Sequence, residues 1–214
     1  GGGHYQRIYG SYSYVGGGWW NYIYSEYGNI GGGCYNWVGG YRAAVSGGTY
    51  SGAYSSYAVV SGGQSNYIYA PYTNIVGAHN SYVYSYGASI AGGMYNSAYG
   101  SWGYVGGGKW NRMYKSYGSI GGGYYNWNYS PYGHIGGGTN HYTYSTYSTI
   151  AGGHNSYVYG YAATVGGGMY TSAYGYASYI GGGWYSRSMG TCTSVGGGYW
   201  LWASAKWSSV GGGQ

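Results

Sequence analysis

The stretch GGGYYNWNYSPYGHIGGG, residues 121–138, decides the fold, because two glycine triplets bracket it at a spacing of fifteen residues. Cutting the chain after every fifteenth residue gives fourteen repeats without an insertion or a deletion, and GGGQ (211–214) starts a further one. A fixed period of this size is typical of a solenoid, in which each turn buries its apolar face only against its neighbours. We therefore treat residues 1–210 as a single repeat domain and number the positions of each repeat from 1 to 15.

Each repeat is too short for a pair of helices, and its small and apolar residues alternate as they do in β-strands. Positions 6, 8 and 10 form one inward set, as in Asn96, Ala98 and Gly100, and positions 13, 15 and the next position 2 form the other. The glycines at positions 1–3, together with Pro71 and Pro131, mark two corners. The pattern predicts an all-β parallel β-solenoid, a flattened two-sheet β-roll with fourteen rungs of fifteen residues.

Two inward positions keep one kind of side chain along the chain. Position 15 is valine or isoleucine in every repeat, and position 6 is asparagine in six repeats, where stacked amides can satisfy one another. We interpret both columns as structural. The predicted core ladder is Val15, Ile30, Val45, Val60, Ile75, Ile90, Val105, Ile120, Ile135, Ile150, Val165, Ile180, Val195 and Val210. The predicted asparagine ladder is Asn21, Asn36, Asn66, Asn96, Asn111 and Asn126.

Position 9 points outward and is tyrosine in eleven repeats. Aromatic side chains in register on adjacent strands stabilise a sheet by a few tenths to about 1 kcal/mol per pair. A column of this kind also exposes more aromatic surface than a monomer normally leaves in water. We therefore predict an assembly or surface-binding ladder. Its members are Tyr9, Tyr24, Tyr54, Tyr69, Tyr84, Tyr99, Tyr114, Tyr129, Tyr144, Tyr159 and Tyr174.

The composition argues against an enzyme. Only 4% of the residues are charged, aspartate is absent and Glu26 is the single glutamate. Neither a carboxylate pair nor a Ser-His-Asp arrangement can be assembled from such a chain. Cys34 and Cys192 lie ten rungs apart with no histidine near either, so we expect them to be free or to pair between chains. We predict no catalytic residue.

Metal, cofactor and nucleic-acid sites are also not expected. His4, His79 and His154 share position 4 but lie five rungs apart, too far for one metal ion. The triplet before Lys109 resembles a phosphate loop, but neither a serine or threonine nor a helix follows, so corner formation explains it. The net charge of +6 is diluted along the chain. This dilution argues against nucleic acid as a partner and leaves weak binding to an acidic polysaccharide or a negatively charged surface open. No apolar run approaches membrane-spanning length, so this segment is not expected to insert into a membrane.

Two segments carry a resemblance to a known family. AGGMYNSAYGSWGYVGGG (91–108) and SGGTYSGAYSSYAVVSGG (46–63) resemble the GG-x-x-N-x-A-x-G-x-x-S-x-V-x-GG repeats of trimeric autotransporter adhesin heads. Similar repeats are found in viral and phage fibre-like proteins, and the resemblance covers all fourteen repeats. It implies a left-handed β-roll that self-associates as a homotrimer or filament at an extracellular, cell or virion surface. Tyrosine at position 9 departs from the small polar residue that is common there in the family.

Two functions remain open at this point. The first is a non-enzymatic structural fibre or adhesin segment that assembles through aromatic and glycine-rich faces and contacts a host surface or polysaccharide. The second is an ice-binding (antifreeze) or glycan-binding solenoid with an exposed tyrosine ladder. Assembly predicts that the ladder is buried between chains, whereas ice binding predicts one flat exposed face. Trp37, Trp127 and Trp202 at position 7 interrupt the regularity that an ice lattice requires.

Overall fold

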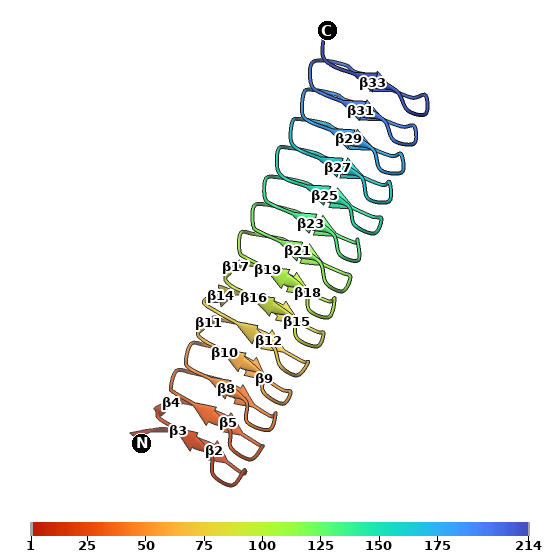
Figure 1. Ribbon diagram of the computed structural model, residues 1–214. Helices are drawn as coiled ribbons and strands as arrows, with labels where there is room; N and C mark the ends of the chain where they lie inside the picture. The colour runs from red at the N-terminus through yellow and green to blue at the C-terminus, as the bar shows by residue number, and fades with distance from the viewer. Residues whose placement is uncertain (1, 214) are drawn as a thin grey trace. The chain divides into compact units, whose positions relative to one another are not determined.

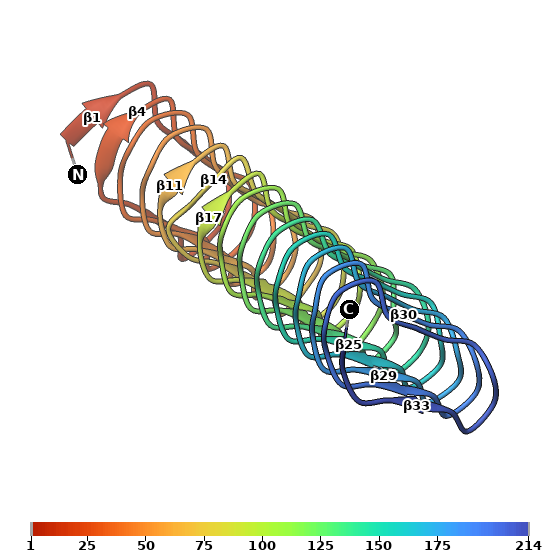
Figure 2. The same ribbon diagram turned by 90° about the horizontal axis from the view of Figure 1, so that it is seen from above.

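The computed structural model describes residues 2–213, and the chain divides into two compact units, Gly1–Gly108 and Lys109–Gln214. The predicted all-β parallel β-solenoid is confirmed, and residues 2–213 contain no helix (Figure 1). Each unit makes seven turns, and one repeat of fifteen residues makes one turn. Within each unit the successive turns lie over one another (Figure 2).

Positions 7–8 of each turn form the first sheet, and positions 14–15 form the second sheet. In the first unit, the first-sheet strands are β2 (Arg7–Ile8), β5 (Tyr22–Ile23), β7 (Trp37–Val38), β9 (Gly52–Ala53), β12 (Tyr67–Ile68), β15 (Tyr82–Val83) and β18 (Ser97–Ala98). The second-sheet strands are β3 (Tyr14–Val15), β6 (Asn29–Ile30), β8 (Ala44–Val45), β10 (Val59–Val60), β13 (Asn74–Ile75), β16 (Ser89–Ile90) and β19 (Tyr104–Val105). Short strands also form near the glycine triplets, namely β1 (Gly2–His4), β4 (Gly17–Trp19), β11 (Gly63–Gln64), β14 (Ala78–His79) and β17 (Gly93–Met94).

The second unit has the same two sheets. Its first-sheet strands are β20 (Arg112–Met113), β22 (Trp127–Asn128), β24 (Tyr142–Thr143), β26 (Tyr157–Val158), β28 (Ser172–Ala173), β30 (Arg187–Ser188) and β32 (Trp202–Ala203). Its second-sheet strands are β21 (Ser119–Ile120), β23 (His134–Ile135), β25 (Thr149–Ile150), β27 (Thr164–Val165), β29 (Tyr179–Ile180), β31 (Ser194–Val195) and β33 (Ser209–Val210).

The register places each position of a repeat over the same position of the next. Val60 pairs with Val45 on one side and with Ile75 on the other, in parallel. Backbone hydrogen bonds continue this stacking, since the Tyr54 N–H donates to the Ile68 carbonyl at 3.0 Å. Because no repeat gains or loses a residue, side chains of one position form columns along each unit.

The core lies between the two sheets and is filled mainly from positions 6, 8, 13 and 15. Thirteen members of the core ladder are buried, and Val210, in the last turn, is partly buried. The prediction that position 2 also faces the core is wrong, because a Cβ added to Gly47 would meet no atom within 4 Å. The close approach occurs at position 3 instead. There a Cβ on Gly48, whose φ is +99°, would lie 2.2 Å from the Gly63 carbonyl oxygen.

The backbone conformation of the corners was not predicted from the sequence. Positions 5 and 12 are left-handed in every described turn, with φ between 47° and 63° at the twenty-seven non-glycine residues. Most of these are tyrosine or tryptophan, which rarely adopt this region. Hydrogen bonds to the preceding turn hold them: Tyr50 N–H donates to Cys34 O, and Tyr57 N–H to Tyr41 O, both at 2.9 Å.

Candidate functional surface

The predicted tyrosine ladder lies on the outer face of the first sheet. In the second unit the rings at position 9 from Tyr114 to Tyr174 stack in sequence, with centroids 4.3, 5.4, 4.7 and 4.9 Å apart and planes within 4°. In the first unit Tyr54 to Tyr99 stack at 4.9–5.3 Å, and Tyr9 stacks on Tyr24 at 5.2 Å. The rings cover one another's faces, and most of them are exposed to solvent.

Position 7 forms a second column beside the ladder. Tyr157 stacks on Tyr142 at 5.2 Å, and it also lies 6.4 Å from Tyr159 of its own turn. This column contains small residues and, unlike position 9, arginines. The small residues are Gly52, Ser97 and Ser172, and the arginines are Arg7, Arg112 and Arg187. Each guanidinium lies over the aromatic ring of the next turn, at 5.1–5.9 Å from its centroid.

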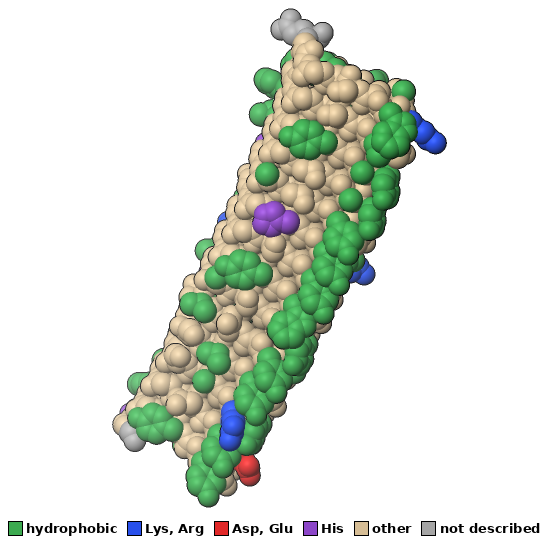
Figure 3. Space-filling model, viewed as in Figure 1, with side chains coloured by type: hydrophobic (Ala, Val, Ile, Leu, Met, Phe, Trp, Pro, Cys, Tyr) green, Lys and Arg blue, Asp and Glu red, His purple; other side chains and the backbone are tan. Residues whose placement is uncertain are grey.

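Two further aromatic columns follow the corners and were missed by the sequence analysis. One occupies position 5, where Tyr170 stacks on Tyr185 at 4.9 Å. The other, the aromatic corner, occupies positions 11 and 12, and Figure 3 shows it as a stripe of hydrophobic side chains in each unit. Its signal is an exchange: position 11 is tyrosine where position 12 is not aromatic, except in the repeat with Thr191 and Cys192. These exchanged tyrosines are Tyr41, Tyr86, Tyr161 and Tyr176.

Several phenols of the first sheet have raised pKa values. Burial, and secondarily the charge that neighbouring phenolates would carry, raises the pKa of Tyr54 to about 12. Burial and the adjacent Tyr114 raise the pKa of Tyr129 to about 12 as well. The pKa values of Tyr84 and Tyr159 are raised for the same two reasons. At neutral pH the ladder is therefore an uncharged surface that carries hydrogen-bonding hydroxyl groups.

The asparagine ladder lies in the core beside the glycine triplets, and all six members are buried. In Asn36 the Nδ2 donates to the carbonyls of Gly32 and Gly48, both at 3.0 Å, and the Oδ1 accepts from the Ser51 N–H at 3.0 Å. The amide thus bonds backbone groups of its own and the next turn rather than a neighbouring amide. This geometry assigns the asparagines a structural role.

His141 takes the place of asparagine at position 6 in one turn. Its Nε2 lies 3.1 Å from the Gly153 carbonyl and its Nδ1 3.2 Å from the Ser156 nitrogen. The backbone N–H of Ser156 can only donate, so Nδ1 accepts and Nε2 carries the proton. Burial of the ring is the main cause that lowers the pKa of His141 to about 4.

Other reactive side chains are dispersed. No three histidine, cysteine or acidic side chains gather among residues 2–213 in a way that could hold a metal ion. Cys34, in the first unit, and Cys192, in the second, are free thiols that are partly exposed. Over the same residues, no helix has the length and apolar character needed to cross a membrane.

Comparison with protein-family models and with curated protein sequences found no match. The fold and its surface are therefore described from this structure alone. It has fourteen turns of about fifteen residues, and exposed tyrosine columns lie along each unit.

Proposed function

We propose that this chain is a non-enzymatic structural segment of a fibre or adhesin, and that copies of it associate through the position-9 column. The observation that carries the proposal is the run of five stacked phenols from Tyr114 to Tyr174. No member of this column is charged, and raised pKa values keep several of its phenols neutral. Exposed aromatic faces of this extent are typical of interaction surfaces.

A second copy of the chain is the partner that best fits the column. Its rings recur in eleven of the fourteen turns, about 4.8 Å apart where they are consecutive, and another solenoid with the same period presents rings at a matching spacing. Association of identical surfaces also gives closed symmetric oligomers. The resemblance of the repeats to trimeric adhesin heads supports a homotrimer, and it supports a location on an extracellular, cell or virion appendage.

The proposal is tested by removing rings from the column and measuring the solution mass by light scattering. We expect Tyr129→Ser/Tyr144→Ser to dissociate the assembly, because this variant loses two adjacent rings of the column. Tyr132→Ser/Tyr147→Ser is the matched control, because it removes an equally stacked pair from the aromatic corner and leaves position 9 intact. Circular dichroism verifies that both variants fold. Equal dissociation of both variants, or of neither, would contradict association through position 9.

The regular spacing of Tyr114 to Tyr174 also favours a second candidate, ice binding by a solitary chain. In that case the column stays exposed, and the chain lowers the freezing point of water below its melting point. The assembly proposal predicts no such thermal hysteresis. Thermal hysteresis that is present in the unmodified chain and lost in Tyr129→Ser/Tyr144→Ser would favour ice binding instead.

A further inference from the structure

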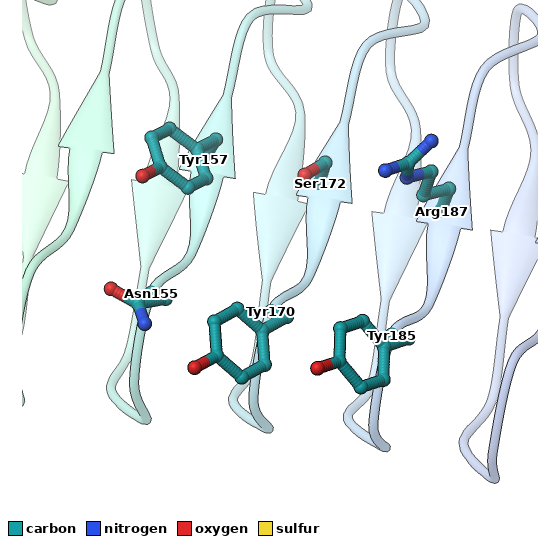
Figure 4. Close-up of a pocket in the computed structure, with 6 residues that line it drawn as sticks. All are labelled: Asn155, Tyr157, Tyr170, Ser172, Tyr185 and Arg187. Atoms are coloured by element: carbon teal, nitrogen blue, oxygen red, sulfur yellow. The ribbon is translucent and has the colours of Figure 1, made fainter.

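The position-7 column of the second unit has a small residue, Ser172, between Tyr157 and Arg187. In successive turns this column runs from Tyr157 through Ser172 and Arg187 to Trp202. The Ser172 side chain is short and buried, and a pocket lies over it between its larger neighbours (Figure 4). The residues that line this pocket are Asn155, Tyr157, Tyr170, Ser172, Tyr185 and Arg187.

The pocket has the width of one ring. Tyr157 and Arg187 are two rungs apart, which corresponds to about 9.6 Å. One face of Tyr157 is covered by Tyr142, whose centroid is 5.2 Å away, and its other face looks toward the Ser172 turn. A flat ring placed over Ser172 would continue the column at the spacing that its tyrosines already have. The width of the pocket therefore indicates a ligand with one flat ring, but it does not indicate the chemistry of that ring.

Polar groups surround the position of the missing ring. Ser172 forms the floor, Asn155 supplies an amide, and Tyr170 and Tyr185 form a second row with their hydroxyl groups on one side (Figure 4). The Oδ1 of Asn155 accepts a hydrogen bond from Asn140, which fixes the orientation of the amide. An aromatic side chain would engage at most one of these groups. A pyranose ring carries hydroxyl groups around its edge and suits several of them, while its face stacks on tyrosine.

Arg187 adds an unpaired positive charge to the pocket. Its guanidinium lies 5.5 Å from the ring centroid of Trp202, which supports it from the far side. The second unit contains no aspartate or glutamate, so no acidic side chain of that unit neutralises this charge. Guanidinium groups bind carboxylates strongly, through paired and charge-assisted hydrogen bonds. The pocket therefore favours a sugar that carries a carboxylate.

We propose that the Ser172 pocket binds a hexuronate residue of an acidic polysaccharide. The pyranose ring lies over Ser172 against the open face of Tyr157, and its carboxylate pairs with Arg187. The site is built from positions 5 and 7 and does not depend on self-association through position 9. The two proposals can therefore fail independently.

The test is isothermal titration of the full chain with a trimer of α-1,4-linked galacturonic acid. Ser172→Tyr fills the pocket. The fold should tolerate this change, because tyrosine stands at the same position of the preceding turn, at Tyr157. Arg187→Gln removes the charge and keeps a side chain of similar length. Each variant should weaken binding about tenfold or more, as expected for loss of a charge-assisted hydrogen bond or of the stacking position.

Two controls separate this site from unspecific attraction. Lys206→Gln removes one positive charge of the same unit at position 11, away from the pocket residues, and should leave the affinity unchanged. The neutral trimer maltotriose should bind about tenfold or more weakly than the acidic trimer. The proposal is overturned if the acidic trimer does not bind, if maltotriose binds equally well, or if Lys206→Gln weakens binding as much as Arg187→Gln.

Discussion

His141 shows how a single residue of the core links the fold to pH. It fills a position that is asparagine in six other turns, and its two ring nitrogens bond backbone groups as the asparagine amide does. Protonation of Nδ1 would place a hydrogen against the Ser156 N–H that now donates to it. The neutral ring is therefore part of the folded state.

The resulting prediction concerns stability in weak acid. The pKa of His141 is lowered from 6.5 to about 4 on folding, so between these values the unfolded chain binds a proton that the folded chain does not. The free energy of unfolding should therefore fall as the pH is lowered through this window, by up to about 3 kcal/mol. Urea unfolding at about pH 7.5 and about pH 4.5 measures the difference. His141→Asn keeps the hydrogen bonds without the titrating group, and an identical pH dependence in this variant would contradict the prediction.

A second residue-scale prediction concerns Ser178, which is buried at position 13. Its hydroxyl oxygen has no hydrogen-bond partner among the described residues, and alanine stands at the same position of the preceding turn, at Ala163. We expect Ser178→Ala to raise the free energy of unfolding by about 1 kcal/mol, because an unsatisfied hydroxyl is removed from the core. Ser148 is the control, because its hydroxyl donates to the Ser145 carbonyl. Ser148→Ala should lower the free energy of unfolding by about 1 kcal/mol. Thermal unfolding of both variants measures the two changes. A loss of stability in both variants would show that Ser178 is satisfied.

At the scale of the element, each turn consists of two strands of two residues and two corners, and the corners carry the backbone strain. The left-handed conformation costs a non-glycine residue roughly 1–2 kcal/mol. At Tyr50 and Tyr57 a hydrogen bond to the preceding turn and stacking of the ring offset this cost. Ala177 has the same conformation, with a φ of 47°, but its methyl group offers no ring to stack.

Ala177→Gly should therefore stabilise the chain. Glycine relieves the strain of the folded chain, but it also raises the conformational entropy of the unfolded chain, which lowers stability by about 0.4–1 kcal/mol. The free energy of unfolding should therefore rise by a few tenths to about 1 kcal/mol. The control is Ala151→Gly, at an exposed site where φ is not positive. That change should lower stability by about 0.5–1 kcal/mol. The comparison is made by chemical unfolding, and a destabilised Ala177→Gly would mean that the corner is not strained.

The elements differ in how far the sequence predicts them. Positions 6 and 15 could be predicted because asparagine recurs at position 6 in six turns, valine or isoleucine stands at position 15 in every turn, and both positions alternate with outward ones. The left-handed corners could not, because tyrosine and tryptophan have no preference for that conformation and only hydrogen bonds between turns impose it. The close approach was predicted at position 2 and lies at position 3. Both positions are glycine, so only the backbone geometry distinguishes Gly47 from Gly48. The aromatic corner was detectable in principle, from the exchange of tyrosine between positions 11 and 12.

The two candidate sites also differ in how far the sequence predicts them. The position-9 column follows from the period alone, and its rings stack within each unit. The Ser172 pocket left only a faint signal, a small residue between Tyr157 and Arg187 in the position-7 column. Its other walls, Tyr170 and Tyr185, come from position 5, and their place beside the pocket depends on the path of the corner.

At the scale of the whole molecule, we assign the position-9 column to self-association and the position-7 column to ligand binding. The five successive rings from Tyr114 to Tyr174 give a long contact with a partner of the same period, whereas the small side chain of Ser172 gives up stacking and leaves a pocket. Low charge is consistent with this division, because charged side chains in the position-9 column would have to be desolvated on assembly.

The most direct test of this account is the solution mass of residues 1–214 by sedimentation equilibrium at micromolar concentration. The account predicts a mass that is a multiple of 22.7 kDa, with three copies expected from the resemblance to trimeric adhesin heads. A chain that remains at 22.7 kDa at every concentration would contradict it, because the tyrosine column would then stay exposed to solvent.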